Sequence, residues 1–302
     1  MPQKQNRRTV IKNLVTGSAA IAGSSTLLSA FPSCASAAGT KETVKDGTLK
    51  GNINHSVCRW TYDFLSLDEL CTTVKNIGFN AIDLTGPKDW PTLKKHGVYS
   101  SMCWGFEISL TEGWNNKQNH ATLIKNYNDG IELTAKAGYK NIICFSGNRN
   151  GMADDVGLKN CAEGLKQIMA QAEKHNIIIQ MELLNSKVDH KDYMCDLSRW
   201  GIELCKQVGS PNFKLLYDIY HMQIDEGDVI RTIQNNHQYF GHYHTGGVPG
   251  RHEIDLTQEL YYPAIMQAIV ATGYKGYVAQ EFIPAKQDKV ASLKQAVQTC
   301  DV

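Results

Sequence analysis

This 302-residue chain lacks an excess of charge of either sign. Lysine and arginine number 31, aspartate and glutamate number 30, and the formal net charge is +1. Because binding to nucleic acid depends on a basic surface, this balance argues against a nucleic-acid partner. Low-complexity tracts are also missing. The composition, 42% hydrophobic and 20% charged, is typical of a globular protein with a large core.

Cysteine pairs of the CxxC type are absent as well, and no regular spacing indicates a disulfide framework. Several cysteines lie inside apolar runs, as Cys144 does between Ile143 and Phe145. We therefore expect buried free thiols. The nine cysteines lie at positions 34, 58, 71, 103, 144, 161, 195, 205 and 300.

The first 37 residues contain no acidic side chain. The pair Arg7-Arg8 precedes a weakly apolar run at residues 14–28, and Ala35-Ser36-Ala37 offers the small residues that a signal peptidase requires. This arrangement resembles a twin-arginine signal, and glycines and serines make the run too polar for a stable membrane span. We expect a signal peptide at residues 1–37, a linker at 38–52, a folded domain at 53–302, and export to the periplasm or beyond.

Short apolar runs alternate with longer amphipathic segments after about residue 52, which predicts strands alternating with helices. The predicted strands cover residues 53–58, 81–84, 98–103, 141–145, 177–183, 213–218, 239–244 and 277–282. The predicted helices cover residues 66–78, 119–137, 154–175, 193–208, 225–235, 258–272 and 286–302. The first helix has Ser66 and Glu69 at the spacing of a capping box, and Gly78 at its end.

This alternation predicts an α/β protein, a single closed (β/α)8 TIM barrel. A doubly wound open sheet is the alternative, but no glycine-rich phosphate fingerprint follows the first strand. The longest loop, residues 105–118, has Trp104 at its start and contains Phe106 and Trp114. Such a loop at the strand ends is suited to line a substrate cavity. Alternatively, the loop packs against the rim of the barrel.

Four consecutive predicted strands each end in a residue that can bind a metal ion. In the fifth strand, Gln180 and Glu182 share one face because side chains alternate along a strand. The carboxyl ends of barrel strands meet at one face, so the four side chains are expected to converge. They are Glu182, Asp218, His244 and Glu281.

Three converging buried carboxylates need a compensating positive charge. A divalent cation meets this need, and three carboxylates with one imidazole suit Mn²⁺, Mg²⁺ or Co²⁺, with Zn²⁺ as a further option. For a single acid, pairing with lysine or arginine is the simpler explanation. Four residues in register on adjacent strands favour a metal site.

The sequence around these positions resembles that of the hydroxypyruvate isomerases, which belong to the xylose isomerase-like barrels. The resemblance extends from about residue 53 to the C-terminus and is densest between residues 180 and 285. It rests on the runs Met181-Glu182-Leu183-Leu184-Asn185, Tyr217-Asp218-Ile219-Tyr220-His221-Met222-Gln223, Gly241-His242-Tyr243-His244, Pro249-Gly250-Arg251 and Gln280-Glu281-Phe282.

The resemblance implies that the four residues bind the metal and that Glu182 and Glu281 act as acid and base. The implied reaction interconverts a small hydroxy-ketone and hydroxy-aldehyde, as between hydroxypyruvate and 2-hydroxy-3-oxopropanoate, through an enediol or enediolate. One position departs from the pattern: several hydroxypyruvate isomerases have glutamine where this chain has His244, whereas ketose 3-epimerases of the same superfamily have histidine. Val188 stands where those epimerases have a further glutamate, which counts against a close match to them.

Other polar residues near the strand ends have alternative assignments from sequence. His221 and Arg251 are candidates to bind the substrate, with a helix-start histidine and an ion pair to Glu253 as the respective alternatives. His242 is expected to pack or to support a ligand, and whether His55 reaches the site is left open.

Three other functions compete with the isomerase. A sugar 3-epimerase or a keto-sugar lyase or hydratase would use the same barrel, and an exported protein meets sugars readily. A non-catalytic exported sugar-binding protein is disfavoured because all four predicted ligands are present. A zinc nuclease would need more histidines and a basic surface. We expect a small-molecule substrate, no nucleic acid, no stable membrane span, and a chain compatible with a homo-oligomer.

Overall fold

Short runs rich in valine, isoleucine and aromatic residues form eight parallel strands in residues 48–302, the part of the chain that the computed structural model describes. Six strands pair in the order β1-β8-β7-β6-β5-β4, and β2 pairs with β3. Their bounds are β1 Asn54–Val57, β2 Ala81–Ile82, β3 Tyr99–Ser100, β4 Asn141–Cys144, β5 Ile178–Glu182, β6 Phe213–Asp218, β7 Phe240–Thr245 and β8 Tyr277–Gln280.

Isolated bridges join these two groups of strands into a ring. Cys58 pairs with Asp83 between β1 and β2, and Cys103 pairs with Ile142 between β3 and β4. Backbone hydrogen bonds support both joins, for example from Asp83 N to Val57 O at 2.8 Å. The predicted TIM barrel is therefore confirmed, although β2 and β3 are only two residues long.

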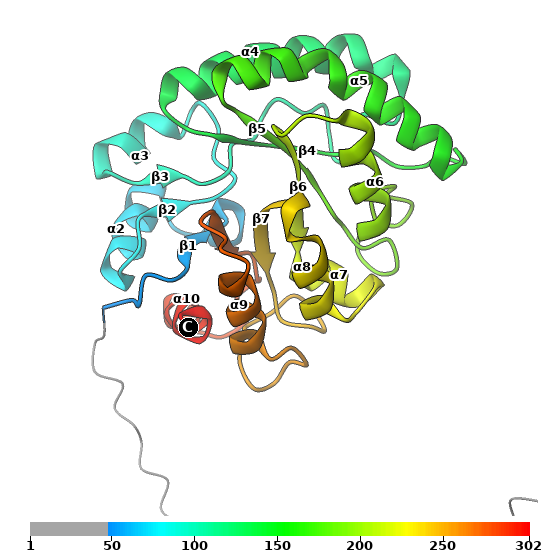
Figure 1. Cartoon of the computed structure of the whole chain (residues 1–302). Coiled ribbons are helices and arrows are strands. Elements are labelled where there is room, and N and C mark those ends of the chain that lie inside the picture. The colour runs from blue at the N-terminus through cyan, green and yellow to red at the C-terminus, as the bar shows by residue number, and fades with distance from the viewer. Residues whose placement is uncertain (1–47) are drawn as a thin grey trace, which may run out of the picture. The chain divides into compact units, whose positions relative to one another are not determined.

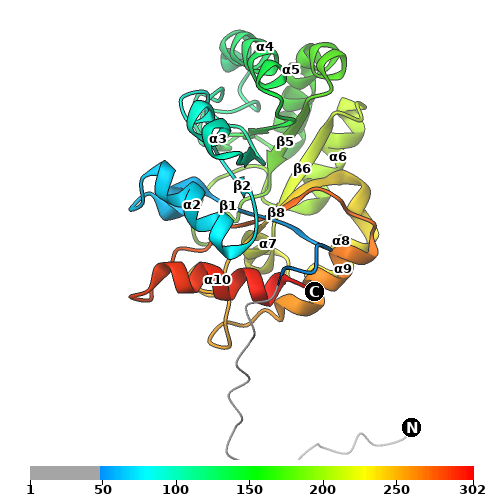
Figure 2. The same cartoon turned by 90° about the vertical axis from the view of Figure 1, so that its left-hand side faces the viewer.

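Helices follow the strands and surround them (Figures 1 and 2). The predicted capping box of Ser66 and Glu69 is confirmed, and the helix it begins ends at Gly78, whose φ of 116° suits glycine. The α-helices are α2 Leu67–Ile77, α3 Trp90–His96, α4 His120–Ala137, α5 Asp154–His175, α6 Ser198–Val208, α7 Ile219–Asp225, α8 Val229–Asn236, α9 Tyr262–Ala271 and α10 Lys289–Cys300. The 3₁₀ turns are η1 Arg59–Tyr62, η2 Lys117–Asn119 and η3 His237–Tyr239.

Two helices were not predicted from the sequence pattern. Helix α3 has seven residues, which is too short to show a clear helical period. Helix α7 begins directly after β6, where the side chain of Asp218 accepts a hydrogen bond from the His221 N–H and caps the first turn. His221 therefore lies in a first helical turn and not in an open loop.

The predicted start of one helix was wrong. Helix α6 begins at Ser198, not at residue 193, because Tyr193 is instead buried under β5 and its hydroxyl donates to Glu182 O at 3.0 Å. The starts of α8, α9 and α10 also lie three or four residues later than the sequence pattern predicts. At these three starts, the residues of the preceding loop fit the spacing of an amphipathic helix, so the sequence pattern placed the helix start too early.

The predicted signal peptide and most of the predicted linker lie outside the described residues. Lys50 and Asn52, at the end of that linker, hydrogen-bond to Asp301 and Val302 at the C-terminus. Across residues 48–302, none of the helices has the length and apolar character that crossing a membrane requires.

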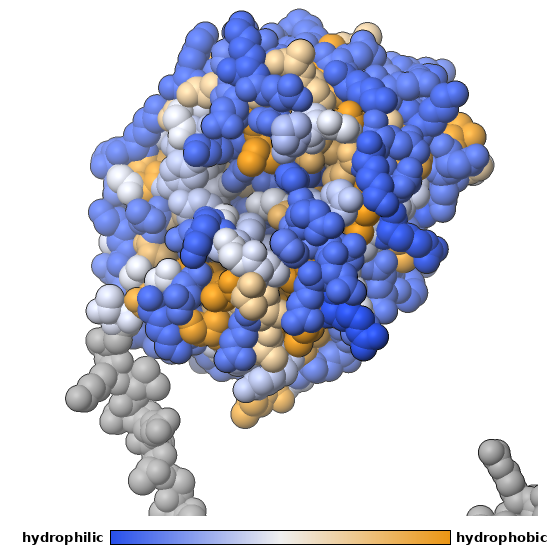
Figure 3. Space-filling model, in the orientation of Figure 1, coloured by the Kyte–Doolittle hydropathy of each residue, from blue (hydrophilic) through white to orange (hydrophobic). Residues whose placement is uncertain are grey.

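Cysteines and surface residues follow the expected distribution. All eight cysteines in the described part of the chain are buried and free, as predicted. On the face shown in Figure 3 the surface is mostly hydrophilic, and hydrophobic residues appear in small separate patches, as on an ordinary globular surface.

Candidate active site

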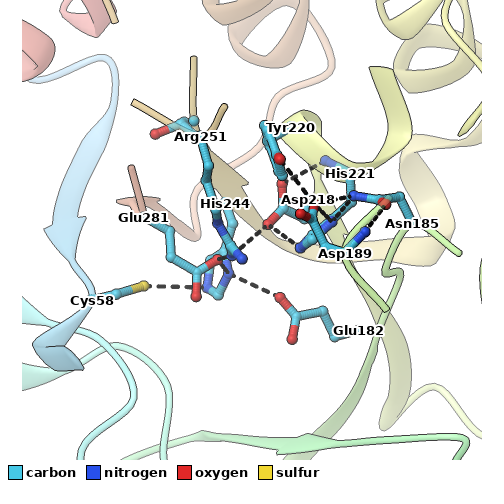
Figure 4. Close-up of polar contacts among 12 residues, drawn as sticks. Cys58, Glu182, Asn185, Asp189, Asp218, Tyr220, His221, His244, Arg251 and Glu281 are labelled. Atoms are coloured by element: carbon cyan, nitrogen blue, oxygen red, sulfur yellow. Dashed lines mark hydrogen bonds and ion pairs between the residues drawn. The ribbon is translucent and has the colours of Figure 1, made fainter. Parts of the chain in front are cut away.

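Four side chains that follow neighbouring strands converge inside the barrel mouth (Figure 4). Each offers one potential ligand atom, and all of these atoms lie within 4.8 Å of one another. Every one of the four side chains is buried. They are Glu182 from β5, Asp218 from β6, His244 from β7 and Glu281 just after β8. The arrangement brings together the four ligands predicted from the sequence.

His244 lies at the centre of this cluster. Its Nδ1 atom is 2.7 Å from Glu281 Oε2 and 3.2 Å from Glu182 Oε1. Arg251 bridges Glu281 and Asp218. Its Nη2 atom is 2.6 Å from Glu281 Oε2 and 3.5 Å from Asp218 Oδ2. The two glutamates therefore approach the same imidazole nitrogen from different strands.

Burial governs the charge state of the acids. It raises the pKa of Asp218 to about 8, and Arg251 opposes this shift only in part. Burial likewise raises the pKa of Glu182, against an opposing hydrogen bond from His244. For Glu281, burial acts in the same direction, but Arg251 and His244 outweigh it and hold the pKa well below its usual range.

The neighbouring carboxylates also shift the pKa of the His244 imidazole. Burial lowers the pKa of His244, but the Glu281 carboxylate beside it, together with Asp83, outweighs burial and raises the pKa well above the ordinary value. The cluster therefore holds protons on side chains that would otherwise repel one another.

This donor set fits a divalent cation. Carboxylate oxygens with one imidazole are ligands that Mn²⁺, Mg²⁺ and Co²⁺ accept, and Zn²⁺ accepts them as well. Burial and the neighbouring Glu281 carboxylate raise the pKa of Asp218, so a further positive charge nearby would favour its charged form. A cation would replace protons in the cluster and supply that charge.

Arg251 is held by aromatic rings as well as by acids. Its guanidinium carbon lies 5.3 Å from the ring centre of Trp60 and 5.4 Å from that of Tyr220. The indole N–H of Trp60 donates to Glu281 Oε1 at 2.8 Å. The alternative partner weighed for Arg251, Glu253, accepts instead from the backbone of Ala285 and Lys286 and from a serine hydroxyl.

His221 lies behind the cluster and does not line the cavity. Its Nδ1 atom is 2.6 Å from the amide nitrogen of Asn185, and its Nε2 is 3.6 Å from Asp218 Oδ2. Burial lowers its pKa well below the ordinary value, and Arg251 acts in the same direction. Because the Asn185 amide donates to Nδ1, the proton of the neutral ring lies on Nε2 and faces the cluster.

A cavity of about 480 Å³ opens above the acids. Arg251 and both glutamates form one side of it, with Trp60 and His190 beside them. The other side is largely apolar and comes from β2 to β4 and their loops. Its residues are Leu84, Trp104, Glu107, Ile108, Ser109, Leu110, Ile143 and Phe145.

The aromatic loop after β3 serves both of the purposes considered from the sequence. Trp104 and Ile108 face the cavity and are 44% and 40% exposed, so they are open to a ligand. Phe106 and Trp114 are buried, and Trp114 packs against Tyr127 with ring centres 5.3 Å apart. The loop is therefore anchored by Phe106 and Trp114 and presents Trp104 and Ile108 to the cavity.

Two other histidines are placed clearly. His242 is fully buried one layer deeper than His244, and its Nε2 lies 3.0 Å from Asp83 Oδ2, so it supports the site as expected. His55 does not reach the site. Its Nε2 lies 3.6 Å from Asp301 Oδ1, and it lines a separate pocket with residues at and before the starts of β1, β2 and β8.

Sequence reasoning missed Asp83, Trp60 and His190. Asp83 directly follows β2, and its Oδ1 lies 3.0 Å from His244 Nε2. The signal that identified Glu182, an acid ending an apolar run, is also present in Ala81-Ile82-Asp83-Leu84 and could have found it. No comparable signal marks Trp60 or His190, which lie in connections between strands and helices.

Sequence comparison identifies relatives of this chain. The family described as "Xylose isomerase-like TIM barrel" matches residues 71–299. A 2-oxo-tetronate isomerase of Cupriavidus necator is 34% identical over 113 residues, which are 37% of this chain and only 43% of that protein. The hydroxypyruvate isomerase of Escherichia coli is 26% identical over 247 residues, 78% of this chain and 94% of that protein.

Solved structures share the fold at low sequence identity. A family 2 AP endonuclease from Brucella melitensis superposes with a TM-score of 0.72 at 21% identity, covering 80% of this chain and 96% of that one. A 3-keto-D-glucoside 4-epimerase from Escherichia coli superposes with a TM-score of 0.68 at 18% identity, covering 82% of this chain and 100% of that one. At such identities the likeness concerns the barrel alone.

Proposed function

We propose, from the premise that this chain belongs to the xylose isomerase-like TIM barrel family, that it is a metal-assisted isomerase of a hydroxy-carbonyl compound. The observation that carries the proposal is the pair of glutamates at one end of the cavity. Glu182 and Glu281 both line it, and both approach His244 Nδ1 from different strands. Two carboxylates beside one bound substrate can carry out a proton shift between adjacent carbons, one as the base and one as the acid.

In this reaction one glutamate takes a proton from the hydroxyl-bearing carbon next to the carbonyl, and the other returns a proton to the former carbonyl carbon. The hydroxyl proton moves to the former carbonyl oxygen, which leaves the new carbonyl on the first carbon. Reversing the reaction exchanges the two roles. A divalent cation held by Glu182, Asp218, His244 and Glu281 would stabilise the negative charge that develops on the substrate oxygens.

The remaining residues orient the substrate. Arg251 faces the cavity and is itself fixed between two aromatic rings, so its guanidinium can bind substrate oxygens without first being ordered. His221 does not reach the cavity, but its backbone N–H donates to Asp218 Oδ1 at 3.1 Å and helps to hold that carboxylate, while its Nε2–H faces the cluster 3.6 Å from Asp218 Oδ2. The apolar side excludes water from the reacting carbons.

Turnover of hydroxypyruvate tests the proposal directly. The purified chain should contain about one divalent cation per molecule, and a chelator should abolish conversion, which added Mn²⁺ restores. Glu182→Gln and Glu281→Gln should each lose the activity while keeping the fold. Conversion that survives complete removal of metal would refute the proposed mechanism.

The size of the cavity favours a second candidate, a sugar epimerase or a keto-sugar lyase or hydratase with the same glutamates. A volume of about 480 Å³ lies within the range of about 300–1,000 Å³ found for pockets that hold much larger molecules than a three-carbon acid. The exposed indole of Trp104 offers an apolar surface against which a sugar ring packs. Metal binding without hydroxypyruvate turnover would favour this candidate, and ketohexoses are the first substrates to assay.

The predicted export fits extracellular sugars better than an intracellular three-carbon acid. The twin-arginine signal remains a prediction for residues 1–37. Immunodetection of the full chain in periplasmic and cytoplasmic fractions tests it, with Arg7→Lys and Arg8→Lys together as the variant expected to abolish export.

A further inference from the structure

We propose that Asp83 is a positioning residue, which holds His244 so that the Nδ1 atom of the imidazole points at the metal cluster. The proposal rests on the metal site of the proposed function. It concerns an aspartate that directly follows β2 and is not one of the four predicted ligands.

The two nitrogens of His244 face different partners. Nε2 lies 3.0 Å from Asp83 Oδ1, and Nδ1 lies 2.7 Å from Glu281 and 3.2 Å from Glu182. An imidazole that donates from Nε2 to a carboxylate keeps the lone pair of Nδ1 for a cation. Asp83 therefore selects which nitrogen serves the cluster.

Asp83 is itself held firmly. Its side chain is fully buried, Ser101 Oγ donates to Oδ2 at 2.5 Å, and His242 Nε2 lies 3.0 Å from the same oxygen. Its backbone N–H donates to Val57 O at 2.8 Å, in the bridge that closes the barrel between β1 and β2. With its second oxygen occupied, the carboxylate cannot turn away from His244 without breaking these contacts.

A second metal site at Asp83 is the competing explanation. Cys58, Asp83 and His244 also offer ligand atoms within 4.8 Å of one another. However, 3.0 Å between Asp83 Oδ1 and His244 Nε2 is an ordinary hydrogen-bond distance, while the Cys58 sulfur lies 3.8 and 3.9 Å from these two atoms. The geometry favours a hydrogen bond in which Asp83 orients the histidine.

Titration of the metal-stripped full chain with Mn²⁺ tests the role of Asp83 without relying on turnover. Asp83→Asn should weaken Mn²⁺ binding by about 10- to 100-fold, the usual loss when the partner of a metal-binding histidine is changed. Asp68→Asn is the matched control, because Asp68 also contacts a histidine, His96 at 2.6 Å, but on the exposed surface. Its affinity should equal that of the wild type.

Nitrogen-15 NMR of His244 in the Mg²⁺-loaded wild-type chain gives a readout that does not depend on the stability of a variant. We expect the ring proton on Nε2. A proton on Nδ1, unchanged Mn²⁺ affinity in Asp83→Asn, or two bound Mn²⁺ ions per wild-type chain would each overturn the role of Asp83. Absence of Mn²⁺ binding by the wild type would instead refute the proposed metal site, so the two failures are distinguishable.

Discussion

The two sides of the cavity differ in both backbone and chemistry. The side formed by β5 to β8 has strands of four to six residues and carries all four predicted ligands. The side formed by β2 to β4 has two strands of only two residues, and it presents Leu84, Trp104, Ile108 and Phe145 to the cavity.

This difference indicates that one side of the cavity carries out proton transfer and the other side selects the substrate. The longer paired strands hold side chains in the accurate positions that proton transfer demands. A loop such as the one after β3 tolerates substitution more readily, so it is suited to decide which substrate is accommodated. Asp83 is the exception, because it follows β2 on the apolar side but its carboxylate lies 3.0 Å from His244 Nε2.

The largest effect is expected from the glutamates of the polar side. Glu182→Gln and Glu281→Gln each remove a proton-transfer group and should lower kcat by about 10²–10⁴-fold, measured as initial rates at saturating substrate. Glu203→Gln, on the exposed face of α6, is the control and should retain wild-type activity. A wild-type rate in either glutamate variant would contradict the assignment of proton transfer to the side formed by β5 to β8.

Removal of metal should lower the stability of the fold without unfolding it. A ligand present at about 100 times its dissociation constant stabilises a fold by about 2.7 kcal/mol. We therefore expect a chelator to lower the melting temperature by several degrees and Mn²⁺ to restore it. Calorimetry checks this, and a melting temperature indifferent to both treatments would contradict a cation shared by four strands.

The segment that carries Arg251 depends on a second buried acid, Glu253. Its carboxylate accepts from two backbone N–H groups and a serine hydroxyl, and although burial opposes this, these bonds lower its pKa. Glu253→Gln should destabilise the fold by about 1–3 kcal/mol, the cost of disturbing buried hydrogen bonds.

A carboxylate whose pKa falls on folding stabilises the protein above the pKa of the unfolded chain, and this contribution is lost as the pH falls through the folded pKa. The stability difference between wild type and Glu253→Gln should therefore shrink below about pH 4. Melting temperatures across pH check this, with the exposed Glu132→Gln as control. A difference independent of pH would show that the charge of Glu253 is unimportant.

The smallest effect is expected on the apolar side. Trp104→Ala should raise KM for a ring-sized sugar by about tenfold, equivalent to about 1.4 kcal/mol of lost contact, and leave kcat nearly unchanged because uniform binding is removed. Tyr261→Ala, an exposed aromatic outside the cavity, serves as control. An equal loss for a three-carbon substrate would show that Trp104 supports the site and does not select the substrate.

The barrel and the convergence of the four candidate metal-binding residues were accessible from sequence for a definite reason. Parallel strands of a barrel end at one face, so acids and histidines that end consecutive apolar runs must meet there. Glu182, Asp218, His244 and Glu281 follow this rule, and the structure brings them together. Short elements such as α3 and α7 escaped because seven residues do not establish a helical period.

By itself, the sequence determined the alternation of strands and helices, the capped helix that begins after Ser66, and the set of residues at the polar side of the cavity. Only the tertiary structure decided how these residues are oriented: Arg251 between Trp60 and Tyr220, His221 behind Asp218, and Asp83 beneath His244. The physical reason is that periodicity and strand ends are local properties of a chain. The partner of a buried charge, by contrast, is set by residues such as Asp83 and His244, which lie 161 positions apart and meet only when the barrel closes.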